Sequence, residues 1–114
     1  MSRFGFARTI AHLEQCKLVL RHDVKSLVVR LQSHGQENTG TRLFIAENVP
    51  QLRYRNPNIS ISLERKFVNE SEVVVNLVDG RKDVLKTANL MNDEIMAKLD
   101  LQYSMNSDEL KDEQ

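Results

Sequence analysis

The spacing of hydrophobic positions changes from one segment of the chain to the next, and these changes predict its elements. Ile10 and Leu13 recur at helical spacing, which predicts a short helix over about residues 6–15. The stretch 24–32 is rich in β-branched and apolar residues, which predicts a strand buried on both faces. The stretch 58–65 alternates isoleucine or leucine with polar residues and predicts a half-buried strand.

A helical region is expected between these two strands. Thr41 can cap its start, and Phe44 belongs to its core face. Pro50 breaks or restarts the helix, because proline is tolerated in a first helical turn. Asn56 precedes Pro57 and is therefore pushed toward extended geometry, which ends the helical region.

The second half of the chain predicts a hairpin. The stretches 71–78 and 81–87 read as strands on either side of Asp79-Gly80. This dipeptide favours a type I′ turn, in which both central residues have positive φ. The second strand carries several charges, which suit the edge of a sheet.

A final helix completes the pattern. Asn89 or Asn92 can cap it, and Ile95, Met96 and Leu99 form its buried stripe. The expected order is therefore helix, strand, helix, strand, strand, strand, helix. A right-handed parallel β-α-β unit, followed by an antiparallel hairpin and a helix on one face, is the layout of a thioredoxin-like domain.

We therefore predict the α/β class, with an α+β-like mixed sheet, and one thioredoxin-like domain over residues 1–103. Its first residues form a short basic lead-in; they are faintly similar to a transit peptide, but we expect them to be retained. Residues 104–114 are polar and acidic, which predicts a flexible tail.

The chemistry expected of a redox thioredoxin is missing. Its Cys-x-x-Cys should stand where the first helix begins, but residues 35–41 read GQENTGT. Cys16 is the single cysteine and reads as a core residue. The histidines lack the spacing of metal ligands, and the sequence has no glycine-rich phosphate-binding loop. It also has no run of about 18 apolar residues, the length needed to span a membrane. We expect no catalysis, cofactor, metal or small-molecule substrate.

The charges are divided unevenly along a chain whose formal net charge is zero. Residues 1–66 hold 11 basic and 5 acidic residues, a net of +6, and residues 67–114 hold 5 and 11, a net of −6. Arg53 and Arg55 flank Tyr54, a pattern that suits phosphate contacts beside a base or ribose. The alternative is a solvated charged face beside a core tyrosine.

Several short motifs resemble a known family. Gly-Thr-Arg at 40–42 stands at the expected helix start, and Asn-Pro at 56–57 opens the next strand. In this order they resemble the mitochondrial ribosomal proteins that share a thioredoxin-like domain without its cysteines. That group also includes a small accessory subunit of respiratory complex I. The Asn-Val-Pro-Gln break at 48–51 and the similarity over about residues 3–101 most resemble a small-subunit member.

The resemblance implies a structural, non-catalytic protein of the mitochondrial ribosome in the matrix, in the small subunit. Its implied partners are mitochondrial rRNA and neighbouring ribosomal proteins, with no membrane insertion. The alternatives are a large-subunit ribosomal protein of the same family and a non-catalytic complex I subunit. The charge argument, more than the family, selects the expected RNA contacts: Arg3, Arg8, Arg21, Arg42, Arg53, Tyr54 and Arg55. For Arg42 the alternative is a pair with an acid inside the domain.

Overall fold

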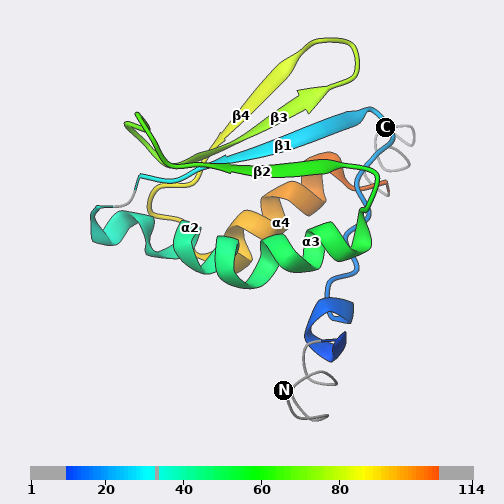
Figure 1. The fold of residues 1–114 in the computed structure, drawn as a ribbon, viewed down its shortest axis with the longest axis horizontal. Helices are drawn as coiled ribbons and strands as arrows, with labels where there is room; N and C mark the ends of the chain where they lie inside the picture. Colours follow the sequence, from blue (N-terminus) through cyan, green and yellow to red (C-terminus); the bar gives the residue numbers. More distant parts are fainter. Residues whose placement is uncertain (1–9, 33, 106–114) are drawn as a thin grey trace.

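Four strands form one mixed sheet in the order β2-β1-β3-β4 (Figure 1). The structure is a computed structural model of the protein and describes residues 10–32 and 34–105. β1 pairs parallel with β2 and antiparallel with β3, and β3 pairs antiparallel with β4. This confirms the expected mixed sheet, with a β-α-β unit followed by a hairpin and a helix; the thioredoxin-like assignment stays a prediction. The strands are β1 Val24–Arg30, β2 Ser60–Glu64, β3 Glu72–Leu77 and β4 Lys82–Lys86.

The described helices lie together on one side of the sheet (Figure 1). Leu27 and Val29 of β1 face them and are fully buried, whereas Val28, on the opposite face, is half-buried. The prediction that this strand is buried on both faces was therefore wrong, because no described helix covers the second face. The helical elements are a 3-10 turn at Gln36–Asn38, α2 Thr39–Leu43, a π-helical turn at Phe44–Asn48, α3 Val49–Arg55 and α4 Asn92–Tyr103.

The core lies between the sheet and the helices. Each large apolar side chain that is fully buried there stabilises the fold by about 1.5–3 kcal/mol relative to an exposed one. The sheet contributes Leu27, Val29, Val73 and Val75, and the helices contribute Phe44, Val49, Leu52, Ile95 and Leu99.

The helical region between β1 and β2 begins earlier than expected. α2 starts at Thr39, so Thr41 lies inside the helix and does not cap it. The Thr41 side chain is instead buried and its hydroxyl donates a hydrogen bond to the Thr87 hydroxyl, at 2.8 Å. The expected restart at Pro50 is confirmed, since proline stands in the first turn of α3, and Asn56 follows the last residue of that helix, as predicted.

The hairpin between β3 and β4 is present but has a different turn. Gly80 has φ +94°, whereas Asp79 does not have a positive φ, so the predicted type I′ turn was wrong. Asn76 pairs with Lys82, and the Leu77 amide donates to the Arg81 carbonyl, which leaves a three-residue loop. Such loops close with a residue of positive φ in their last position, which glycine adopts without strain. The edge position of β4 is confirmed.

The start of α4 also differs from the expectation. Asn92 is the first helical residue, and Asn89, with φ +67°, lies before the helix, so neither caps it. The carboxylate of Glu94 instead accepts a hydrogen bond from the Met91 amide, at 3.3 Å. The predicted buried stripe is confirmed, because Ile95 and Leu99 are fully buried and Met96 packs half-buried against the core.

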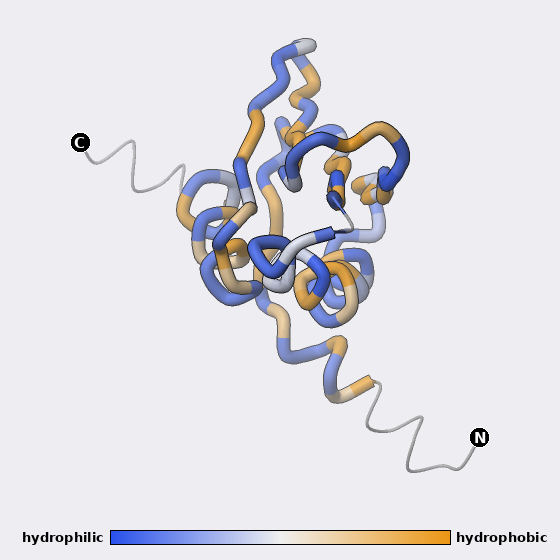
Figure 2. The backbone as a smooth tube through the Cα atoms, turned by 90° about the vertical axis from the view of Figure 1, so that its left-hand side faces the viewer, coloured by the Kyte–Doolittle hydropathy of each residue, from blue (hydrophilic) through white to orange (hydrophobic). Residues whose placement is uncertain are grey.

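The N-terminal helical turn extends away from the sheet, as both views show (Figures 1 and 2). Residues 10–14 are helical, which confirms the described part of the helix expected at 6–15; residues 6–9 lie outside the described ranges. His12 connects the turn to the helical layer. Its carbonyl accepts a hydrogen bond from the Gln51 side-chain Nε2 at 2.9 Å, and its own ring Nε2 lies 3.0 Å from the Glu47 carbonyl.

Candidate nucleic-acid interface

The end of α3 presents two of the predicted contact residues to solvent. Tyr54 is 48% exposed, and Arg55 is exposed beside it. The Nε of Arg55 donates to the Cys16 carbonyl at 3.1 Å, which fixes the base of the guanidinium. Its two terminal amino groups have no hydrogen bond to the described residues. The side chain is therefore held in place through Nε while these two groups can bind a ligand.

Arg55 borders a groove of about 410 Å³ that the sequence did not predict. The segment before β1, the loop after α3 and the residues that follow β3 and α4 form its walls. Arg21, His22 and Lys25 add further basic groups, and none of the described residues that line the groove is acidic. This sign of charge favours an anionic ligand.

A second recess, of about 250 Å³, lies at the hairpin end of the sheet. Lys25, Arg81 and Lys82 line it, together with Ser26 of β1 and Asn76 of β3. Lys25 lines both recesses, so the two adjoin. We call this surface the basic end and define it by the exposed residues His22, Lys25, Arg55, Arg81 and Lys82.

Four of these five basic residues were missed as candidate contacts. The register places Ser26 opposite Asn76, and Asn76 opposite Lys82, so β1 meets the distant β3–β4 hairpin at one end of the sheet. The signal was present in the charges of the predicted edge strand, but these were interpreted only as protection against further pairing. Combining that strand with the antiparallel order would have brought Lys82 close to Lys25.

Arg21 lines the groove but is held within the domain. Its side chain is only 10% exposed, and its Nε and Nη2 donate to the two carboxylate oxygens of Asp23, at 3.0 and 3.1 Å. The guanidinium carbon also lies 5.6 Å from the centre of the Tyr103 ring, within the range of a cation–π contact. Asp23 therefore neutralises much of the charge that Arg21 would offer to RNA.

Arg42 does not join the basic end. One terminal nitrogen donates to the Thr39 hydroxyl at 3.0 Å and to the Gly35 carbonyl at 3.4 Å, at the start of the helical region. Arg3 and Arg8 lie outside the described residues. The contact roles of these three arginines stay predictions.

Arg53 faces the outer edge of β2. Its Nε and Nη2 donate to the Ile61 carbonyl at 3.1 and 2.7 Å. Residues of an edge strand in a parallel pair turn their backbone groups alternately toward the neighbouring strand and away from it. The Glu64 carbonyl points inward, where it accepts from Leu31, so Ile61, three residues earlier, points outward. Arg53 thus covers a carbonyl that would otherwise be open to another strand.

Replacing Arg53 by alanine is expected to lower the free energy of unfolding by about 1–2 kcal/mol, because two charged hydrogen bonds are lost. Self-association should also increase, because the β2 edge is opened. Chemical denaturation and light scattering measure the two effects, with Lys66→Ala, at an exposed position, as the control. Unchanged stability and association in the Arg53 variant would contradict the edge-covering role.

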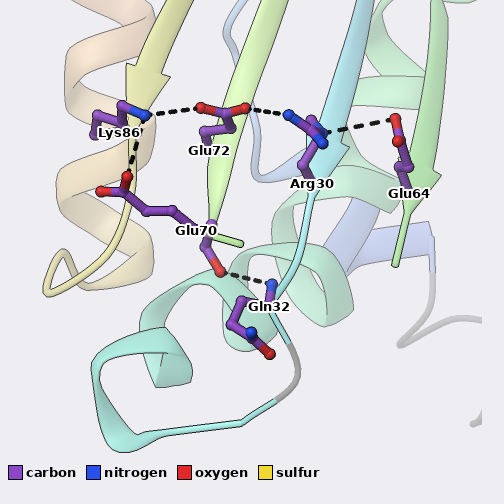
Figure 3. A network of polar contacts seen from close by, with 7 residues as sticks. Arg30, Gln32, Glu64, Glu70, Glu72 and Lys86 are labelled. Atoms are coloured by element: carbon purple, nitrogen blue, oxygen red, sulfur yellow. Dashed lines mark hydrogen bonds and ion pairs between the residues drawn. The ribbon is translucent and has the colours of Figure 1, made fainter. Parts of the chain in front are cut away.

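The far end of the sheet carries a network in which the charges largely cancel (Figure 3). Arg30 lies between Glu64, at 3.7 Å, and Glu72, to which it donates a hydrogen bond. Lys86 lies 3.1 Å from Glu72 and 3.1 Å from Glu70. Within this network each of the two basic groups, Arg30 and Lys86, is paired with acids.

Glu72 is buried in this network, and two effects on its pKa oppose each other. Burial raises the pKa of the carboxyl, but hydrogen bonds from Lys86 and Arg30 lower it by more, so the net pKa lies below its usual 4.5. A carboxyl with a lowered folded-state pKa stabilises the protein above its unfolded pKa, and this contribution is lost as the pH falls through the folded value.

Glu72→Gln is therefore expected to lower the free energy of unfolding by about 1–2 kcal/mol near neutral pH. The difference between variant and wild type should shrink below pH 4.5, where the wild-type carboxyl also becomes protonated. Urea denaturation at several pH values measures it. A difference that stays constant down to acid unfolding would show that the charge of Glu72 contributes nothing.

Other kinds of site find little support in the described part of the chain. Cys16 is buried, as expected of a core cysteine. Within residues 10–32 and 34–105 no three or more histidine, cysteine, aspartate or glutamate residues are grouped so that they could hold a metal. No helix in those ranges has the length and apolar character to cross a bilayer.

Comparison with known proteins supplies the remaining evidence. Small ribosomal subunit protein mS25 of Bos taurus is 29% identical over 111 residues, which are 97% of this chain. The chain is similar to a small ribosomal subunit protein. The Rattus norvegicus mS25 is 26% identical over 98% of the chain, and the Drosophila melanogaster mS25 is 32% identical over 68%. The resemblance predicted from the 40–42 and 56–57 motifs is confirmed.

The relatives are longer than this chain. The matches cover 64% of the bovine protein, 66% of the rat protein and 46% of the fly protein. The chain thus spans somewhat less than two thirds of the length of the mS25 proteins that it matches. No protein-family model matches it.

Proposed function

We propose that the protein is a structural component of the small subunit of the mitochondrial ribosome, where it binds rRNA and neighbouring ribosomal proteins. The observation that carries the proposal is the similarity to mS25, which extends over 97–98% of the chain in the two mammalian comparisons. The location that follows is the mitochondrial matrix, the compartment in which that ribosome works.

The basic end supports the RNA part of the proposal. Its five exposed basic residues come from three segments of the chain and surround two recesses whose described lining residues include no acid. A protein that contacts folded RNA through phosphates needs such a surface. The protein has a scaffolding role and no catalytic one, which agrees with ribosomal relatives and with the missing dithiol.

The similarity favours the small subunit over the two alternatives. The three relatives are all named as small-subunit proteins. Neither a large-subunit ribosomal protein nor a complex I subunit is among them.

Sedimentation of the tagged protein tests the proposal. In a mitochondrial lysate resolved on a sucrose gradient, the protein should sediment with the small ribosomal subunit, together with its rRNA. Treatment with ribonuclease should move it to the top of the gradient. Sedimentation with the large subunit or with complex I would contradict the proposal.

A further inference from the structure

We propose that the basic end binds single-stranded RNA, with an unstacked base in the groove and backbone phosphates on Lys25 and Lys82. The proposal rests on the proposed function and names the class of RNA that this surface contacts. It is carried by the shape and lining of the two recesses.

The floor and walls of the groove are largely apolar. Val19 and Val78 remain 40% and 62% exposed there, and Ile59 and Pro57 line the same space. Apolar side chains gathered in a solvent-filled recess gain free energy when a flat, weakly hydrated group covers them. The faces of a nucleobase are such groups, and exposed Asn58 on the groove wall offers an amide to the polar edge of a base.

The size of the groove separates single-stranded from double-stranded RNA. Its volume of about 410 Å³ lies in the range of pockets that hold small ligands. In a duplex each base is stacked and paired, so the helix offers phosphates and 2′-hydroxyls but no base that can enter a recess. An unpaired nucleotide can turn its base outward and into the groove.

Lys25 and Lys82 are the best placed groups for the phosphates. Lys25 lines both recesses, and Lys82 lines the second. Both side chains are exposed and neither has an ion pair within the described residues, whereas the neighbouring Arg81 is held by Asp79, at 2.7 Å. An apolar groove beside cationic groups matches a polymer that alternates bases with phosphates.

An acidic segment of a neighbouring protein is the competing ligand. Its carboxylates would satisfy the same lysines. It has no flat ring to cover the exposed valines unless an aromatic residue is present, and the adjoining recesses suit a regular repeat of ring and phosphate better. The experiment includes this ligand as a competitor.

Fluorescence anisotropy with the full chain tests the proposal. A labelled RNA strand of about 12 nucleotides should bind about 10-fold more tightly than the same strand annealed to its complement. The Lys25→Gln/Lys82→Gln variant should bind the single strand more weakly, and its dependence of log K on log salt should be less steep by about 1.4, because two phosphate contacts are lost. Lys66→Gln/Lys98→Gln, with the same charge change at exposed positions away from both recesses, is the control.

Val78→Ser separates the base contact from the phosphate contacts. Val78 is 62% exposed, so the substitution should leave the fold intact. Binding of the single strand should weaken about 3-fold while the salt dependence stays unchanged, because the lost contact is apolar. Circular dichroism checks that all variants fold.

Equal affinity for single strand and duplex would overturn the proposal, as would a control variant that weakens binding as much as Lys25→Gln/Lys82→Gln. A glutamate-rich peptide that displaces the RNA at equal concentration would assign the surface to an acidic protein partner. These results are independent of sedimentation: a protein that sediments with the small subunit but shows no preference for single strands rejects this proposal and leaves the proposed function standing.

Discussion

Replacing Gly40 by alanine is expected to unfold the protein under conditions in which the wild type is folded. A Cβ at this position would overlap the Leu90 carbonyl oxygen and lie 2.7 Å from the Met91 Cα. Both atoms belong to backbone immediately before α4, so they cannot move aside as a flexible side chain could. Separating α2 from α4 would disrupt the helical layer, at a cost of at least about 3 kcal/mol.

Gly80→Ala is the matched control for this prediction. No atom lies within 4 Å of a Cβ at Gly80, but its φ of +94° disfavours any side chain. We expect this substitution to lower the free energy of unfolding by about 1 kcal/mol, from the backbone conformation alone. Thermal unfolding followed by circular dichroism compares the two variants. Similar losses would mean that α2 does not pack as closely against the start of α4 as the structure indicates.

Gly40 also illustrates what the sequence could and could not provide. The Gly-Thr-Arg motif was recognised as part of a family pattern, but its physical reason was not visible, because Leu90 lies 50 positions away along the chain. Thr41 was misinterpreted for the same reason. A threonine before an apolar helix is typical of a cap, and only the distant Thr87 makes it a buried hydrogen-bonding residue.

Local patterns were reliable where local physics decides the structure. The order of strands and helices, the restart at Pro50 and the hairpin around Gly80 follow from backbone preferences of a few adjacent residues. The hairpin turn type failed because Asp79-Gly80 also fits a three-residue loop, with Val78 as its first member. Loop length depends on the register of the two strands, which the dipeptide does not determine.

The candidate site was harder to predict because charge says little about where a side chain is held. Arg53 and Arg55 are two residues apart and looked equivalent in the sequence. Their side chains turn to different neighbours, Arg53 to the Ile61 carbonyl and Arg55 to the Cys16 carbonyl beside the groove. Lys25 was counted among the basic residues but not chosen, because only the folded sheet brings it close to the hairpin.

Asn56→Ala is expected to be the second severe substitution and to lower the free energy of unfolding by about 3 kcal/mol or more. The Asn56 side chain is buried and connects the segment at Leu18 and Leu20 to the end of α3. Its Oδ1 accepts from the Leu20 amide at 2.9 Å, and its Nδ2 donates to the carbonyls of Leu18 and Leu52, at 3.0 and 3.1 Å. Alanine would leave the Leu20 amide and the Leu18 carbonyl without these partners, whereas the Leu52 carbonyl keeps the backbone amide of residue 56, at 2.8 Å. Each unsatisfied buried group costs about 1–3 kcal/mol.

The same substitution should also alter the shape of the groove. Asn56 itself lines the groove, and the segment at Leu18 and Leu20 leads to the basic residues before β1. Chemical denaturation measures the stability, with Asn58→Ala, at an exposed position two residues later, expected to change it by less than about 0.5 kcal/mol. At a temperature where the Asn56 variant remains folded, its affinity for single-stranded RNA should be reduced while its salt dependence is kept, since Lys25 and Lys82 are unchanged. Wild-type stability in the Asn56 variant would show that its three hydrogen bonds are replaced by water, and that the loop after α3 is positioned by Pro57 and apolar packing alone.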